Sequence, residues 1–394
     1  MFTMQRGTLM SFTLRPMLVA LAVTAVAASR CSAECSSSTA DEPIVIVAPV
    51  AHQVVQRQLD SSKVAGADQA DQRGFANVRV QLKVSSEQDP AVLECRVLTL
   101  PVASESNKKT TWQPLKFEAS KDPNASPNEG MISLVRIPAG GWYRLEVRSK
   151  KSPDKVAAVE PFGVGEVFLV AGQSYATNTN DERLLVTDPM KRVAAKKIGE
   201  NIWQVANDPQ PAPDGSDGGS IWPALGDRLV TELNLPVGFV NVAVGGTSST
   251  QWLPEGTLYP RLEAAGKSLG SFRAVLWQQG ESDVIEKTST ERYMANIERI
   301  RRTAVDAWGF EPIWLCALST HHPTVYNDPE GEGRIRTALQ QLWTRPGFGP
   351  GPDTDELKGE NRGDPKSRRH FSAIGQRRAA DMWFDVLRTR INAP

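Results

Sequence analysis

Residues 164–174 read Val-Gly-Glu-Val-Phe-Leu-Val-Ala-Gly-Gln-Ser, an apolar run that ends in a glycine turn and a serine. Further apolar runs follow at residues 237–244, 273–277 and 312–318. Continuous apolar strands that alternate with helices are typical of a parallel sheet covered on both faces. The sequence therefore predicts an α/β fold in the second half of the chain.

Helical spacing of apolar residues predicts four helices, at Trp222–Asn234, Glu291–Ala307, Gly333–Trp343 and Ser372–Arg388. In α/β sheets, ligands bind at the carboxyl ends of the strands. The turns that follow the strands are therefore expected to carry the ligand-binding and catalytic residues.

The segment ahead of this sheet has a different pattern. Short alternating or β-rich runs lie at residues 78–84, 92–97 and 142–147, separated by clusters of Asp, Asn, Pro and Gly. A period of two with such turns indicates a small antiparallel β-domain. We expect it to cover residues 43–163, and the α/β domain to cover residues 164–394.

The N-terminus has the pattern of a secretory signal peptide, which we expect to occupy residues 1–33. Arg6 and Arg15 precede an uncharged stretch from Met17 to Ala28, and small residues follow. This pattern predicts export to the periplasm or the extracellular space. Neither this stretch nor any later one reaches the ~20 apolar residues of a membrane helix, so no stable membrane span is expected.

Composition narrows the choice of partners and cofactors. The 45 basic and 45 acidic side chains cancel, which leaves no electrostatic footprint for nucleic acid. Cys31, Cys35, Cys95 and Cys316 are too few and too scattered for a disulfide framework or a zinc cluster. We expect a small or neutral ligand, no metal or other cofactor, and burial of Cys95 and Cys316 as small apolar side chains. The oligomeric state is not predicted.

Polar, glycine-containing turns follow the first three apolar runs, at residues 171–175, 245–248 and 278–283. They would converge on one rim of the sheet. Ser174 comes directly after a buried strand and a glycine, which suits a nucleophile in acyl transfer. A strand-to-helix cap would give the same local pattern.

A serine nucleophile needs a base, and the chain has four histidines. His370 opens the last predicted helix on the same side of the sheet, which makes it the best candidate for the general base. His321 and His322 follow the fourth run and either line the substrate site or belong to an incidental polar loop. His52 is expected at the surface of the β-domain.

A developing oxyanion requires fixed donors. The backbone N–H groups of Ser174 and Gly246 would supply two, and a side chain of the third turn the last, with Gln279 as first choice and Ser282 as second. Gly245 and Gly246 would also permit a positive φ, and both interpretations can hold together.

The three turns and His370 together resemble the GDSL-like (SGNH) hydrolases. Within them, the sequence is similar to the sialate O-acetylesterase and acetylxylan esterase branch of carbohydrate esterase family 6. The matching blocks are residues 164–174, residues 241–248 with Gln251 and Trp252, residues 275–283, and residues 370–372 with Gly375. The resemblance implies a flavodoxin-like three-layer SGNH hydrolase domain, preceded by an antiparallel β-sandwich.

The same resemblance implies a serine esterase that removes acetyl or similar small acyl groups from carbohydrates such as sialic acids or xylan, without a metal. Ser174 would be the nucleophile, His370 the base, and the oxyanion donors would come from Ser174, Gly246 and Gln279. The residues that we expect to contact the substrate are Gln173, Trp252, Glu281 and His321. For Trp252, stacking on a sugar and packing in the core remain equal alternatives, whereas Trp277 lies inside a strand and is expected in the core.

Two positions differ from the family pattern. Tyr175 stands where the family has Asn directly after the nucleophile, and Ser367 stands where it has Asp three residues before the catalytic histidine. We expect Asp364 to be the carboxylate that orients His370, with Asp355 as the second choice. The third alternative is a dyad without a carboxylate.

Two other interpretations remain. Residues 172–176 are one residue away from the Gly-x-Ser-x-Gly pattern of α/β-hydrolases, but that fold would leave the second and third glycine turns unexplained. A non-catalytic carbohydrate-binding protein with the same fold would account for Tyr175 and Ser367, and an ester-cleavage assay separates it from an enzyme.

Overall fold

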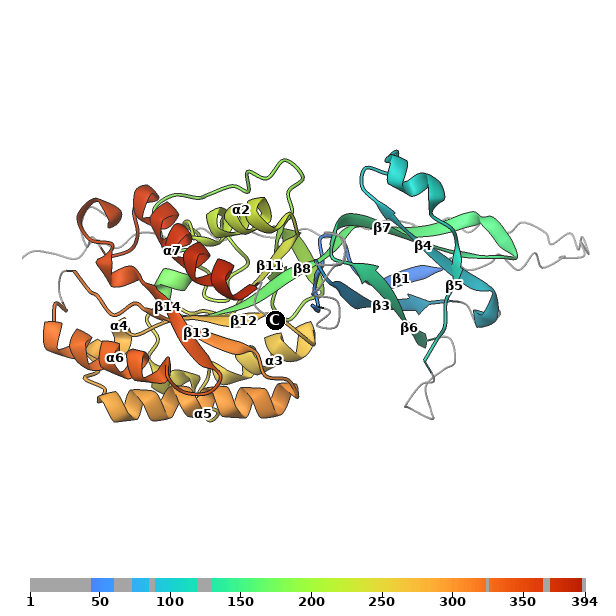
Figure 1. Cartoon of the computed structure of the whole chain (residues 1–394). Helices are drawn as coiled ribbons and strands as arrows, with labels where there is room; N and C mark the ends of the chain where they lie inside the picture. Colours follow the sequence, from blue (N-terminus) through green and yellow to red (C-terminus); the bar gives the residue numbers. More distant parts are fainter. Residues whose placement is uncertain are drawn as a thin grey trace, which may run out of the picture. The chain divides into compact units, whose positions relative to one another are not determined.

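The computed structural model of the chain describes residues 44–59, 73–84, 89–118, 129–323, 326–363 and 369–391 (Figure 1). All of them belong to one compact unit, Glu42–Pro394. The predicted signal peptide lies outside the described residues. No helix in the described ranges is long and apolar enough to cross a membrane.

A mostly parallel sheet forms the centre of the C-terminal part, with the strand order β10-β9-β11-β8-β12-β13-β14. Only the β10–β9 pair of this order is antiparallel. The strands are β8 (Ser152–Gly172), β9 (Val193–Lys197), β10 (Ile202–Val205), β11 (Val237–Asn241), β12 (Ala274–Gln278), β13 (Ile313–Leu318) and β14 (Phe348–Asp353). When β8 is counted first and β11 second, the order 2-1-3-4-5 results, and sheets of this order bind ligands between the first and third strands. The expected ligand position is therefore the carboxyl end of β8 and β12.

Helices cover both faces of this sheet, with α2 and α7 on one face and α3, α5 and α6 on the other (Figure 1). The helices are α2 (Trp222–Leu233), α3 (Tyr259–Leu269), α4 (Glu281–Ile285), α5 (Thr290–Trp308), α6 (Pro329–Leu342) and α7 (Ala373–Ile391), and the 3-10 turns are η2 (Pro90–Val92), η3 (Glu105–Lys109), η4 (Ser174–Ala176), η5 (Ser249–Trp252), η6 (Thr354–Glu356) and η7 (Gly359–Asn361). The four predicted helices are confirmed as α2, α5, α6 and α7. The helices α3 and α4 were not predicted, because α3 buries Ala265 and Gly266 along with its larger side chains and α4 is too short to show a period.

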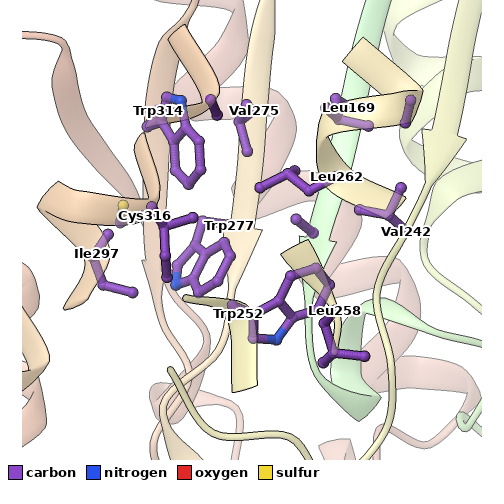
Figure 2. Packing of buried hydrophobic residues seen from close by; sticks show 14 of the residues in the cluster. Leu169, Val242, Trp252, Leu258, Leu262, Val275, Trp277, Ile297, Trp314 and Cys316 are labelled. Atoms are coloured by element: carbon purple, nitrogen blue, oxygen red, sulfur yellow. The ribbon is translucent and has the colours of Figure 1, made fainter. Parts of the chain in front are cut away.

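The core beneath α3 and α5 contains a cluster of tryptophans (Figure 2). Trp277 is fully buried, with its ring centroid 5.7 Å from that of Trp252 and 5.8 Å from that of Trp314. Core packing of Trp277 is thus confirmed. Trp252 is fully buried as well, and its indole N–H donates to Oγ1 of Thr247 at 3.1 Å.

The two cysteines of the described residues are buried free thiols, as predicted. Cys316 is one of the side chains of the tryptophan cluster (Figure 2). Burial raises the pKa of the Cys95 thiol to about 11. Both residues therefore act as apolar packing groups at neutral pH.

The N-terminal part contains an antiparallel sheet of β1, β3 and β6 and a second set of strands, β4, β5 and β7, that continues into β8. The strands are β1 (Val45–Ala48), β2 (Val54–Gln56), β3 (Phe75–Lys83), β4 (Leu93–Thr99), β5 (Gln113–Pro114), β6 (Glu129–Pro138) and β7 (Gly140–Ser149). The three predicted β-rich runs fall on β3, β4 and β7. Side chains from both sets of strands form one apolar cluster, so the N-terminal part has a core of its own.

The predicted domain boundary between residues 163 and 164 falls inside β8, a single strand of 21 residues. Its first half pairs with β7 and its second half with β11 and β12. At this junction the fully buried Glu166 carboxylate accepts from Nε of Arg57 at 2.5 Å and Nε of Arg273 at 2.8 Å. The two halves of the chain are therefore joined by a shared strand and a buried ionic contact.

Candidate active site

The first turn of the site carries Ser174, which begins η4 directly after β8. Gly172 has a φ of +136°, and a Cβ there would lie 2.1 Å from the carbonyl oxygen of Gln278. Only glycine lets β8 and β12 approach so closely at this point. Ser174 is 4% exposed, and its hydroxyl makes no hydrogen bond within the described ranges. Buried hydroxyls without a partner are costly, and a functional site is one place where they persist.

The second turn places two glycines beside this serine. A Cβ at Gly245 would lie 3.7 Å from Cβ of Ser174, and the Gly245 N–H donates to Oδ2 of Asp214 at 3.0 Å. Gly246 has a φ of +68°, as expected for this turn. Neither the Ser174 N–H nor the Gly246 N–H donates a hydrogen bond to any described residue. Both N–H groups can therefore donate to an incoming oxyanion without breaking an existing bond.

The third turn carries Gln279, which is fully buried. Its Nε2 lies 2.6 Å from Oδ2 of Asp283 and 3.1 Å from the carbonyl oxygen of Thr247, and its Oε1 accepts from the Tyr293 hydroxyl at 2.8 Å. The amide has only two N–H groups, and both have protein acceptors. Gln279 thus fastens the second turn to the third, and its predicted role as an oxyanion donor would require it to give up one of these bonds.

Gln173 and Glu281 link the first turn to the third. The Oε1 atom of Gln173 accepts from the N–H groups of Gly280 and Ser282 at 3.2 and 3.1 Å, and its Nε2 donates to Oε2 of Glu281 at 2.8 Å. Gln173, Glu281 and Trp252 each have no exposed surface. Their burial does not fit the direct substrate contact expected of them, because every contact of theirs described above is with neighbouring protein groups.

Glu281 also holds Arg369, the residue before the predicted base. Nε and Nη2 of Arg369 lie 2.8 and 3.0 Å from the two carboxylate oxygens, and Nε2 of His322 lies 3.5 Å from Oε1. Burial raises the pKa of the Glu281 carboxyl, while the bonds from Arg369 oppose that shift. Burial and the nearby Arg369 charge lower the pKa of His322, which favours its neutral form at neutral pH.

The predicted base lies next to the nucleophile turn. The His370 ring packs edge-on against Tyr175, with ring centroids 5.4 Å apart. The Tyr175 hydroxyl lies 2.6 Å from the carbonyl oxygen of Arg369 and 3.2 Å from that of His321. Burial raises the pKa of the Tyr175 phenol, so it stays a neutral donor. The structure thus brings His370 beside the residue that follows Ser174.

Two aspartates were expected as the carboxylate that orients His370, and the described residues include only one of them. Asp364 and Ser367 lie outside the described residues. Asp355, the second choice, accepts from the N–H of Thr320 at 2.8 Å and of His321 at 2.9 Å through Oδ1, and from Arg336 at 2.8 Å through Oδ2. Both of its oxygens are engaged by these groups, which argues against a role in orienting His370.

Of the four expected substrate contacts, His321 alone is partly exposed. Its Nδ1 lies 2.9 Å from Oε1 of Glu332. That bond fixes the ring and leaves Nε2 as the atom that could face a ligand. No group of three or more His, Cys, Asp or Glu side chains that could hold a metal ion occurs in the described part of the chain.

Sequence reasoning missed two contributions to this site, the Arg369 side chain and the Tyr175 hydroxyl. A buried glutamate requires a cation or a proton, so Glu281 in a strand-end turn was a signal that a partner exists. The sequence does not say which of the chain's many arginines is that partner, because the contact joins residues 88 positions apart.

Comparison with known proteins finds a family match over the segment that carries the three turns of the site. The family model for carbohydrate esterases described as sialic acid-specific acetylesterases matches residues 164–328. That segment includes Ser174, Gly246 and Gln279, whereas His370 lies beyond it.

A probable carbohydrate esterase from Arabidopsis thaliana is 38% identical over 81 residues, which are 20% of this chain and 31% of that protein. The chain thus matches about a third of that relative's length. The crystal structure of a carbohydrate acetylesterase from Xanthomonas citri covers 88% of this chain and 75% of its own, with 15% identity and a TM-score of 0.54. The latter likeness concerns the fold. Residues 164–328 are thus similar to the carbohydrate esterase family of sialic acid-specific acetylesterases, and the structure has an SGNH-like hydrolase fold.

Proposed function

We propose that this chain is a serine esterase that removes acetyl or similar small acyl groups from carbohydrates, such as sialic acids or xylan. The observation that carries the proposal is the buried Ser174 hydroxyl, which has no hydrogen-bond partner among the described residues and lies in a turn packed against His370. The strand order, the two helix layers and the separate N-terminal core support a three-layer flavodoxin-like domain preceded by a β-sandwich.

The reaction follows from these groups. His370 takes the proton of the Ser174 hydroxyl as Oγ attacks the acyl carbon of the ester. The N–H groups of Ser174 and Gly246 stabilise the negative oxygen of the tetrahedral intermediate. The intermediate expels the sugar oxygen, which receives the proton from His370. Water, activated by the same histidine, then hydrolyses the acyl-enzyme and releases the carboxylic acid.

The imidazolium formed in each half-reaction requires a negative partner or an oriented acceptor. We assign that role to Asp364, six positions before His370 in the chain. Of the Gln279 bonds to Thr247 and Asp283, the bond to Thr247 is the longer. Gln279 completes the oxyanion hole when this N–H turns from Thr247 to the negative oxygen of the intermediate.

The experiment that tests the proposed function is acetate release by the purified chain from an aryl acetate, acetylated xylan and acetylated sialic acids. Hydrolysis of the aryl acetate together with one of the carbohydrates supports the proposal and identifies the sugar class. Binding of an acetylated carbohydrate without acetate release from any of the three would instead indicate a non-catalytic binding protein.

We also propose that the chain is exported. The support is the N-terminal sequence pattern, with Arg6 and Arg15 ahead of the apolar stretch from Met17 to Ala28. N-terminal sequencing of the secreted protein tests this, with cleavage near Ala33 as the expected result and retention of Met1 in the cell as the contrary one.

A further inference from the structure

The Glu281 carboxylate accepts hydrogen bonds from the two segments that carry the proposed nucleophile and base. One oxygen accepts from Nε2 of Gln173, the neighbour of Ser174, and both accept from the guanidinium of Arg369, the neighbour of His370. The carboxylate is fully buried and lies in α4, which belongs to neither segment. Glu281 therefore forms a bridge between two parts of the chain that are almost 200 residues apart.

We propose that Glu281 is a positioning residue that fixes Ser174 relative to His370 through Gln173 and Arg369. The inference rests on the proposed function, because it assumes that these two residues react together. Glu281 itself bonds the neighbours of the reacting groups rather than the groups themselves. Glu281 would thus contribute to catalysis by holding Ser174 and His370 in the relative position that lets the Ser174 proton pass to His370.

The chemistry of the bridge requires a carboxylate. A planar guanidinium binds two carboxylate oxygens at once, which fixes orientation as well as distance. An amide in place of Glu281 offers one acceptor oxygen, which in the place of Oε2 can retain the bond to Gln173 and one bond to Arg369, but not the bidentate contact. Misplacement of reacting groups by about 1 Å costs on the order of 10²-fold in rate, so loss of this contact should appear in kcat.

Gln173 gives the bridge its second anchor. Its Oε1 accepts from Gly280 and Ser282, the residues on either side of Glu281, while its Nε2 donates to Glu281. The nucleophile turn is thus attached to the start of α4 by three hydrogen bonds. The base is attached to the same point through Arg369, whose carbonyl oxygen also accepts from Tyr175.

The fold contains a matched control for a purely structural role. Glu166 is also a fully buried glutamate held by arginines, Arg57 and Arg273. It lies eight residues before Ser174 in the chain, mostly along extended strand, which separates the two by roughly 25 Å. Loss of the Glu166 carboxylate should therefore lower stability without changing the site.

The test compares Glu281→Gln with Glu166→Gln in kcat, KM, Tm and the rate of covalent labelling of Ser174 by an organophosphonate. We expect Glu281→Gln to lower kcat and the labelling rate by about 10- to 100-fold, with KM changed by less than about threefold. For Glu166→Gln we expect kcat within about twofold of the unaltered chain, even where its Tm falls as far as that of Glu281→Gln. If Glu281→Gln does not fold, Arg369→Lys keeps the charge, removes the bidentate contact, and should give the same loss of kcat.

Two outcomes overturn the inference. One is a kcat within about twofold of the unaltered chain for both Glu281→Gln and Arg369→Lys, and the other is an equal loss of kcat in Glu166→Gln. Neither affects the proposed function, which fails separately if Ser174→Ala keeps its activity.

Discussion

The Tyr175 hydroxyl donates a 2.6 Å hydrogen bond to the carbonyl oxygen of Arg369, so the residue after the proposed nucleophile holds the residue before the proposed base. The family pattern has an asparagine at position 175, whose shorter side chain would not reach as far. In this chain the tyrosine is fully enclosed and also packs against the rings of His370 and Phe371. The departure from the family pattern thus has a structural role.

Removal of that hydroxyl should weaken catalysis more than folding. Tyr175→Phe keeps the ring contact with His370 but loses the bonds to the carbonyl oxygens of Arg369 and His321. We expect kcat to fall by about 5- to 10-fold with little change in KM, because the altered bonds position the base rather than the substrate. Steady-state kinetics of ester hydrolysis measures this effect.

The matched control is Tyr259→Phe. The Tyr259 side chain is also buried, and its hydroxyl has no partner in the described ranges. Its removal should leave kcat unchanged. An equal loss of kcat in both variants would show that the effect of Tyr175→Phe is not specific to the site.

Most of the fold was predictable because apolar periodicity reports directly on burial. Residues 167–171 and 274–277 of the predicted runs lie in strands and are fully buried, and the patterned helices are present. The helix α3 was not predicted, because half of its buried residues are alanine and glycine, which give a weak apolar pattern. The boundary between residues 163 and 164 followed from a change of pattern, whereas β8 runs through it because an extended backbone can belong to two sheets in succession.

The site was predictable in its turns but not in its polar contacts. The positions of Ser174 and Gly246 follow from glycine turns at strand ends. The burial of Gln173, Trp252 and Glu281 does not, because a polar or aromatic side chain in such a turn has the same sequence signature whether it contacts a ligand or a neighbouring turn. That distinction depends on long-range partners such as Arg369.

Gly246 supplies a donor that acts mainly in the transition state. Gly246→Ala should lower kcat by about 10- to 100-fold with a smaller effect on KM, because a methyl group at a φ of +68° displaces the N–H group. A Cβ at this position would otherwise meet no atom within 4 Å. Kinetics over a range of ester concentrations separates the two parameters.

Gly199 provides the control for backbone strain alone. It has a φ of +77° and equally open space around its Cβ position, and it lies between β9 and β10. Gly199→Ala should lower Tm by a similar amount and leave kcat unchanged. A change in KM alone for Gly246→Ala would make that residue a substrate contact instead.

The identity of the orienting acid is tested by a third comparison. We expect Asp364→Asn to lower kcat by about 10²-fold or more, because the imidazolium of His370 would lose its negative partner. Asp355→Asn should mainly lower Tm, since the Asp355 carboxylate bonds Thr320, His321 and Arg336. Ser367→Ala should have little effect on kcat. Near-normal kcat in Asp364→Asn would leave a Ser174–His370 dyad to carry the reaction.

The central claim is that Ser174 is the nucleophile, and Ser174→Ala tests it most directly. Ser319 gives a matched control, since it follows β13, is 1% exposed, and has a hydroxyl without a hydrogen bond among the described residues. The measurement is kcat/KM for an aryl acetate, with Tm recorded for each variant. The account predicts a loss of at least ~10³-fold for Ser174→Ala and a change of less than about twofold for Ser319→Ala. Full activity in a folded Ser174→Ala variant would contradict it.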